Sequence, residues 1–393
     1  MVDAGRLNRV SVSRVKLRDP ASEHFCTNNF RFALSLRFTW RVIDTDEQLE
    51  ALLARIGRAG WVALDTEADS LHAYPEKLCL LQISLPGADE LLDPLAAMEI
   101  GPLIEVLRKR ELIMHGADYD LRLLRRTYEF VPESVVDTML AARLHGFTEF
   151  GLTSLVEKLL GVRLEKGSQT ADWAKRPLTE RMINYARNDT HHLKPLWDRL
   201  KSRLEDSGRL HWHKESCARL VKECAEVRAA DPDQTWRVKG ADKLDRRALA
   251  VLRELWHWRD GEAVAANRPP FFILRHDTLV ALAQAAVVGK NVESLLPARL
   301  AQRRREGVLV AVRRGLGLPA SQWPQPNRYS TPRSNAGEKR RYEELRQRRD
   351  RRAAELSIDP TLIASRATLS AVARDWDAAQ TALMAWQREL LEH

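Results

Sequence analysis

The stretch Trp61-Val62-Ala63-Leu64-Asp65-Thr66-Glu67 places two acidic residues at the end of an apolar run. A short apolar run of this kind predicts a buried β-strand. Side chains alternate between the two faces of a strand, so Asp65 and Glu67 lie on the same face. Two carboxylates at the end of a core strand repel each other and lose hydration energy. A divalent cation would offset both costs, whereas the simpler interpretation is an acidic turn after a strand.

The sequence around this stretch predicts an α/β domain. A helix is predicted over 48–56, with Thr45 or Asp46 as its cap. Strands are predicted at 61–65, 78–84 and 90–92, and their short connections indicate an antiparallel meander. The elements then alternate: helix 95–109, strand 112–114, a helix from 117, strand 135–136, and helices 138–145 and 152–160. A meander followed by alternation favours an α/β fold with a mixed central sheet.

A third acid lies where a predicted strand gives way to a helix. Asp120 precedes Leu123 and Leu124 by three and four positions, which places it on the inward face of that helix. Asp118 instead suits the exposed start of the helix, where negative charge is favourable. His115, just before it, is expected either to contact a substrate or to make a structural hydrogen bond.

A fourth acid, Asp189, lies inside the apolar stripe of a predicted long helix. The stripe repeats every three or four residues from Met182 to Leu204, and Pro177 is placed near the first turn. Tyr185 precedes Asp189 by one turn on the same face. An unpaired carboxylate inside such a stripe is costly or protonated. Ligation of a cation and a buried ion pair with an arginine would each remove that cost.

Five of these residues, Asp65, Glu67, Asp120, Tyr185 and Asp189, resemble in order and context the tyrosine-containing branch of the DEDD 3′→5′ exonucleases. The segments that match run over 61–84, 115–124, 137–138 and 168–193, including Asp172-Trp173 and Arg176-Pro177-Leu178. Together they resemble ribonuclease D across residues 41–205. That family has a ribonuclease-H-like fold, in agreement with the predicted mixed sheet.

The resemblance implies a metal-dependent 3′→5′ exoribonuclease that releases 5′-nucleoside monophosphates. Asp65, Glu67, Asp120 and Asp189 would bind two Mg²⁺ or Mn²⁺ ions, and Tyr185 would position the attacking water or help to deprotonate it. The family further implies structured RNA, above all tRNA precursors, as the partner.

Two other functions stay open at this point. A DNA exonuclease would use the same metal chemistry, since contacts to the 2′-hydroxyl distinguish RNA from DNA. A catalytically silent RNA-binding adaptor would be expected to lack at least one of the four acids.

The second half of the chain is predicted to be helical. The segments 236–240, 244–259 and 269–274 resemble the HRDC module, which would span 211–290. A second, divergent HRDC-like copy is predicted over 295–393, with a flexible Pro- and Ser-rich loop at 319–335. Trp256, Trp258 and Trp386 are interpreted as helix-bundle core rather than as base-stacking platforms. The arginine runs 303–305 and 339–352 either contact phosphates or form a solvated helix face.

Composition sets the remaining expectations. The 393 residues carry a formal net charge of +9, which favours anionic partners such as nucleic acid. Four cysteines without a CxxC pair predict a reducing, cytoplasmic setting and argue against a structural zinc site. No apolar run is long enough to span a membrane, and the opening lacks a signal-peptide core. Residues 1–40 are predicted to form a poorly ordered extension.

Overall fold

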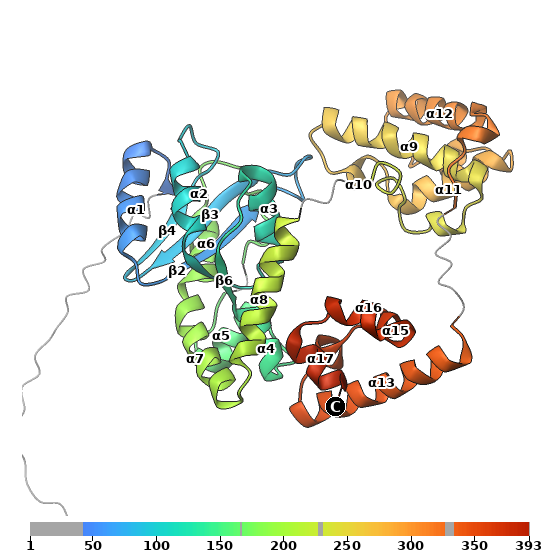
Figure 1. The fold of residues 1–393 in the computed structure, drawn as a ribbon. Coiled ribbons are helices and arrows are strands. Elements are labelled where there is room, and N and C mark those ends of the chain that lie inside the picture. The colour runs from blue at the N-terminus through green and yellow to red at the C-terminus, as the bar shows by residue number, and fades with distance from the viewer. Residues whose placement is uncertain (1–41, 166, 227–230, 327–333, 393) are drawn as a thin grey trace, which may run out of the picture. The chain divides into compact units, whose positions relative to one another are not determined.

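The computed structural model describes residues 42–165, 167–226, 231–326 and 334–392 (Figure 1). The extension predicted at 1–40 lies outside them. An α/β domain with one six-stranded sheet comes first along the chain, and the remainder is helical. None of the described helices is long and apolar enough to cross a membrane.

The sheet is mixed, as the sequence predicts. Its strands are β1 (Val42–Ile43), β2 (Val62–Ala68), β3 (Leu78–Leu85), β4 (Ala88–Leu92), β5 (Glu111–Met114) and β6 (Ser134–Asp137), in the order β1-β4-β3-β2-β5-β6. Strands β2, β3 and β4 form the antiparallel meander. Strands β5 and β6 run parallel to β2, so the carboxyl ends of these three strands share one edge.

Helices cover both faces of the sheet (Figure 1). One face, with Leu64, Ile83 and Leu112, packs against α1 (Asp46–Arg58), α2 (Gly101–Arg108) and α3 (Asp118–Tyr128). The opposite face, with Ala63 and Leu80, packs against α4 (Thr138–His145), α5 (Leu152–Leu160), α6 (Glu180–His191) and α7 (Leu193–Asp206). Because side chains alternate along β2, Asp65 and Glu67 belong to this second face.

The prediction of one long helix over Met182 to Leu204 is wrong. The segment forms two helices, α6 and α7, separated at His192. Pro195 lies in the first turn of α7 and has no N–H to donate to a carbonyl four residues earlier, so a continuous helix cannot form there. Pro177 precedes α6 rather than opening it, since Thr179 is the N-cap residue.

The helix predicted from residue 95 is also shorter than expected. Asp93 accepts a hydrogen bond from the Leu95 amide at 2.9 Å, and its carbonyl accepts one from the Ala96 amide at 3.2 Å. These bonds fold the segment into a turn, so α2 begins only at Gly101, with Pro102 in its first turn.

The helical part contains two groups with the same local pattern. Helix α8 (Leu210–Ala225) comes first and packs against β6 and α3. The first group is α9 (Arg246–Ala265), α10 (Pro270–Ile273), α11 (His276–Val287) and α12 (Gln302–Gly317). The second is α13 (Ala336–Leu356), α14 (Pro360–Ile363), α15 (Arg366–Arg374), α16 (Trp376–Ala379) and α17 (Ala385–Glu392). Short 3-10 turns lie at Ala241–Lys243, Glu293–Leu295, Ala320–Gln322 and Gln380–Ala382.

The two groups match in detail. Arg259 of α9 donates a hydrogen bond to the Leu274 carbonyl at 3.2 Å, 15 residues later. Arg349 of α13 donates to the Ala364 carbonyl at 3.0 Å, again 15 residues later. In both groups the short helix that follows begins with a proline. The pattern therefore recurs as an internal repeat.

The tryptophans behave as core residues. Trp386 is buried, and Trp256 and Trp258 are partly buried against an apolar cluster of the first helical group. The loop predicted at 319–335 is partly ordered: the Trp323 indole N–H donates to the Leu318 carbonyl at 2.9 Å, whereas 327–333 lie outside the described residues.

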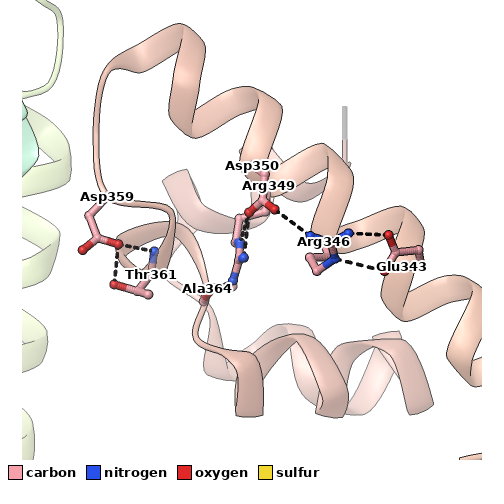
Figure 2. A network of polar contacts seen from close by, with 7 residues as sticks. All are labelled: Glu343, Arg346, Arg349, Asp350, Asp359, Thr361 and Ala364. Atoms are coloured by element: carbon pink, nitrogen blue, oxygen red, sulfur yellow. Dashed lines mark hydrogen bonds and ion pairs between the residues drawn. The ribbon is translucent and has the colours of Figure 1, made fainter.

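Most arginines of α13 bond within their own group (Figure 2). Arg346 pairs with Glu343 and Asp350, and Arg349 donates to Asp350 at 2.6 Å as well as to the Ala364 carbonyl. Arg348 donates to two carbonyls at the end of α17. These bonds support a structural role for much of the arginine run at 339–352.

Candidate active site

The structure brings the five predicted site residues together at the edge shared by the ends of β2, β5 and β6. Asp65 and Glu67 come from β2, Asp120 from the first turn of α3, and Tyr185 and Asp189 from consecutive turns of α6. Repulsion from at least one other acid of the set raises the pKa of Asp65, of Glu67 and of Asp189. The structure thus brings acids from one strand and two helices to one place, and their binding of cations stays a prediction.

The environment disfavours negative charge on all four acids. Burial, reinforced by the neighbouring carboxylates, raises the pKa of Glu67 to about 9 and that of Asp189 to about 7. The same causes raise the pKa of Asp65 well above its usual value. Burial raises the pKa of Asp120 to about 6, although a hydrogen bond from the Thr66 hydroxyl to Asp120 opposes that shift.

Tyr185 stays protonated in this environment. Burial and the charges of Asp189, Glu67 and Asp65 raise its pKa well above the usual value. Its ring packs beside the buried ring of Trp173, with 6.1 Å between centroids. The phenol therefore has a hydrogen to donate, and the packing against Trp173 holds its ring in place.

A cavity of about 670 Å³ opens beside these residues. Such a volume is within the range of small-molecule sites. The polar residues in its lining include Asp65, His115, Gln169, Tyr185, Asn188 and Asp189. Sequence reasoning missed Gln169 and Asn188, although both lie within four residues of Tyr185 or of Asp172, which the resemblance singles out.

The side chains fit divalent cations. No three histidine, cysteine, aspartate or glutamate side chains within the described ranges form a ready-made metal site. The donor set is nevertheless composed of carboxylate oxygens, which suit Mg²⁺ and Mn²⁺. A cation would also reverse the mutual repulsion that raises the pKa values of Asp65, Glu67 and Asp189.

Among the residues that the structure describes, no arginine forms an ion pair with Asp189. Arg187, on the same helix, pairs with Asp89 at 3.2 Å. Arg176 makes two hydrogen bonds to Asp93 and donates to the Trp173 carbonyl at 2.6 Å. Arg176 thereby anchors the segment that carries Trp173 against the sheet, next to Tyr185.

Three neighbouring polar residues have structural partners. The Nδ1 atom of His115 lies 2.9 Å from the Thr138 hydroxyl, so the structural hydrogen bond predicted as one alternative is present. Asp118 is exposed and pairs with Arg122 at 2.9 Å, as expected for the helix start. Asp137 accepts from backbone amides of Gly116, Ala117, Met139 and Leu140, and so holds the starts of α3 and α4.

Comparison with known proteins assigns the family. A family described as 3′-5′ exonuclease matches residues 40–205, and the HRDC domain matches residues 248–291. A ribonuclease D from Jannaschia sp. (strain CCS1) is 31% identical over 297 residues, covering 72% of this chain and 76% of that protein. This chain belongs to the ribonuclease D family. The predicted enzyme class is confirmed: this ribonuclease D is a 3′→5′ exoribonuclease.

Two further relatives extend the match along the ribonuclease D chain. A ribonuclease D from Granulibacter bethesdensis is 29% identical over 363 residues, covering 89% of this chain and 90% of that protein. The crystal structure of Escherichia coli RNase D, an exoribonuclease involved in structured RNA processing, is 26% identical with a TM-score of 0.70. It covers 90% of this chain and 98% of that chain. Nucleases of this family generally use divalent metal ions.

The raised pKa values predict that this ribonuclease D loses stability in EDTA as the pH rises. Each folded carboxyl keeps its proton at pH values where the unfolded group, near 3.8 for Asp189 or 4.5 for Glu67, has lost it. Stability is full below those values and is lost as the pH rises through the folded pKa values, about 7 for Asp189 and about 9 for Glu67. We expect the Tm in EDTA to fall by several degrees between about pH 5 and pH 9.

Thermal unfolding followed by circular dichroism would measure this fall. Glu67→Gln serves as the control, since it removes one titrating group and should flatten the slope. A Tm that stays constant or rises over this range would contradict the electrostatic picture.

Proposed function

We propose that this ribonuclease D trims the 3′ ends of structured RNAs, with cytoplasmic tRNA precursors as natural substrates, by two-metal-ion hydrolysis. The observation that carries the mechanism is the convergence of Asp65, Glu67, Asp120 and Asp189 beside Tyr185. Bound Mg²⁺ or Mn²⁺ ions would supply activation of the attacking water and stabilisation of the leaving 3′-oxygen. The four carboxylates would hold those ions, and 5′-nucleoside monophosphates would be released.

Tyr185 would orient the attacking water by donating its phenolic hydrogen. Its raised pKa leaves the proton on the phenol at neutral pH. Deprotonation of the water would then depend on the cations, which lower the pKa of bound water by several units. Arg176 and Trp173 support this role by fixing the wall against which the Tyr185 ring packs.

The substrate assignment has separate support. The Escherichia coli relative is described as acting in structured RNA processing. The net charge of +9 favours a polyanion, and the HRDC domain is a nucleic-acid-binding module. The internal repeat further supports a second HRDC-like domain. The first helical group runs on to Gly317 at the end of α12 and the second begins at Ala336 in α13, so the boundary between the two domains lies later than the predicted 290–295.

The first helical group exposes an aromatic surface suited to single-stranded RNA. Phe271 and Phe272 are 47% and 58% exposed, with 4.5 Å between ring centroids. Exposed Arg268 and Arg275 flank them in sequence. Bases stack on such rings while guanidinium groups contact phosphates.

We expect the double substitution Phe271→Ala and Phe272→Ala to weaken RNA binding about 10-fold, because base stacking contributes roughly 1–3 kcal/mol per base. Fluorescence anisotropy with a 3′-tailed RNA measures the loss, and hydrolysis of a dinucleotide should be unchanged. Thr361→Ala, on α14 of the second group, is the matched control and should bind as wild type. Unaltered affinity in the double variant would remove this surface from the RNA path.

A degradation time course tests the proposed function as a whole. RNA and single-stranded DNA, each labelled at the 5′ or the 3′ end, are incubated with Mg²⁺ or with EDTA. We expect 5′-labelled RNA to shorten one nucleotide at a time, 3′ label to appear at once as mononucleotide, and EDTA to stop both. A tRNA precursor should lose its 3′ trailer. Activity that survives EDTA, or faster cleavage of DNA, would reject the proposal.

A further inference from the structure

Gln82 of β3 is fully buried, with 0% of its surface exposed. Neither its Oε1 nor its Nε2 atom has a hydrogen-bond partner among the described residues. A buried primary amide without partners is unfavourable, and such groups in folded proteins call for an explanation. Ser84, two residues further along β3, does have partners: its hydroxyl donates to Asp89 at 2.6 Å and lies 2.8 Å from the Thr190 hydroxyl.

The strand register places Gln82 beside the candidate metal ligands. Gln82 is the direct partner of Asp65 in the antiparallel β2–β3 ladder. Residues directly opposite each other in such a ladder project to the same face, with Cβ atoms about 5 Å apart. The Gln82 amide therefore lies on the carboxylate face of the sheet.

Helix α6 covers that position. Ser84, two residues along β3 on the same face, contacts Thr190 of α6, the residue that follows Asp189. Ala186, one turn earlier on α6, is fully buried in a cluster with Leu80 of β3. Gln82 lies between these two contacts, so it is enclosed by the strands and by the helix that carries Tyr185 and Asp189.

Burial excludes a direct contact between Gln82 and RNA. The partner that can reach its amide is a group already inside, and the carboxylate of Asp65 is directly across the strand pair. To hold a cation, that carboxylate has to keep one orientation. Ligating carboxylates characteristically accept a hydrogen bond from an outer group that fixes their orientation.

We propose that Gln82 is a positioning residue of the metal site: its amide N–H₂ donates to the Asp65 carboxylate when cations are bound. This inference rests on the proposed two-metal function. If the amide donates to Asp65 only when cations hold that carboxylate, removal of the amide should stabilise the protein in EDTA and weaken cation binding.

Gln82→Met tests the inference, because it keeps the volume and removes both polar atoms. We expect the Tm in EDTA to rise by a few degrees and the Mn²⁺ affinity, measured by isothermal titration calorimetry without RNA, to fall about 10-fold or more. Gln82→Leu is the second apolar variant. Ser84→Ala is the matched control on the same strand and face: its Tm in EDTA should fall, and its Mn²⁺ affinity should match wild type.

The outcomes separate this inference from the proposed function. Mn²⁺ affinity within twofold of wild type in both Gln82 variants would overturn the role of Gln82 while leaving the two-metal proposal intact. A wild-type enzyme that binds no Mn²⁺ and works in EDTA would overturn both.

Discussion

Asp189→Asn is expected to lower the single-turnover rate of RNA hydrolysis by about a thousandfold or more. The substitution keeps the side-chain shape but removes the charge with which α6 would hold a cation, and metal ions contribute several kcal/mol to transition-state stabilisation. Since each 1.36 kcal/mol is about tenfold in rate, such a loss reaches this size. RNA affinity measured in EDTA should stay within a few-fold of wild type, because Asp189 would act through the cation.

Asp118→Asn is the matched control for this experiment. Asp118 lies on α3, two residues before Asp120, but it is exposed and paired with Arg122. Its substitution should leave the hydrolysis rate close to that of wild type. Equal rates for Asp189→Asn and wild type would remove Asp189 from the site.

Tyr185→Phe is expected to slow single-turnover hydrolysis about 100-fold, the lower end of what a positioned proton-transfer or orienting group contributes. Only the hydroxyl is lost, so the ring still packs against Trp173 and Mn²⁺ affinity should be unchanged. The pH–rate profile should keep its shape, because the phenol is protonated throughout the neutral range. A profile that loses its acid limb would instead identify Tyr185 as the general base.

Tyr128→Phe provides the comparison. Tyr128 is a partly buried tyrosine at the end of α3, packed against the apolar core of the opposite face. Its substitution should have little effect on rate. An unchanged single-turnover rate in Tyr185→Phe would reject the proposed role of the phenol.

The part of the site that sequence reasoning identified is the part encoded by local periodicity. Asp65 and Glu67 share a face because a strand alternates, and Tyr185 and Asp189 share one because a helix repeats. The family resemblance then linked these local patterns to Asp120. Such patterns suffice wherever neighbours in space are also neighbours along one element.

What the sequence did not reveal depends on pairing between distant segments. Gln82 is a polar residue in a largely apolar strand, and its position opposite Asp65 follows only from the pairing of β2 with β3. The bond from Thr66 to Asp120 and the anchoring of Trp173 by Arg176 likewise join separate elements. The break at His192 was open to local reasoning, since Pro195 is visible in the sequence.

The four amide bonds accepted by Asp137 affect how any mutational survey of this enzyme should be interpreted. One carboxylate holds the first turns of two helices, and one of those helices carries Asp120. A variant at Asp137 would displace Asp120 without removing any atom that faces a cation. Loss of activity alone therefore does not distinguish a residue that contacts the substrate or a cation from a residue that fixes where a helix begins. Affinity for Mn²⁺ has to be measured beside rate before either label is assigned.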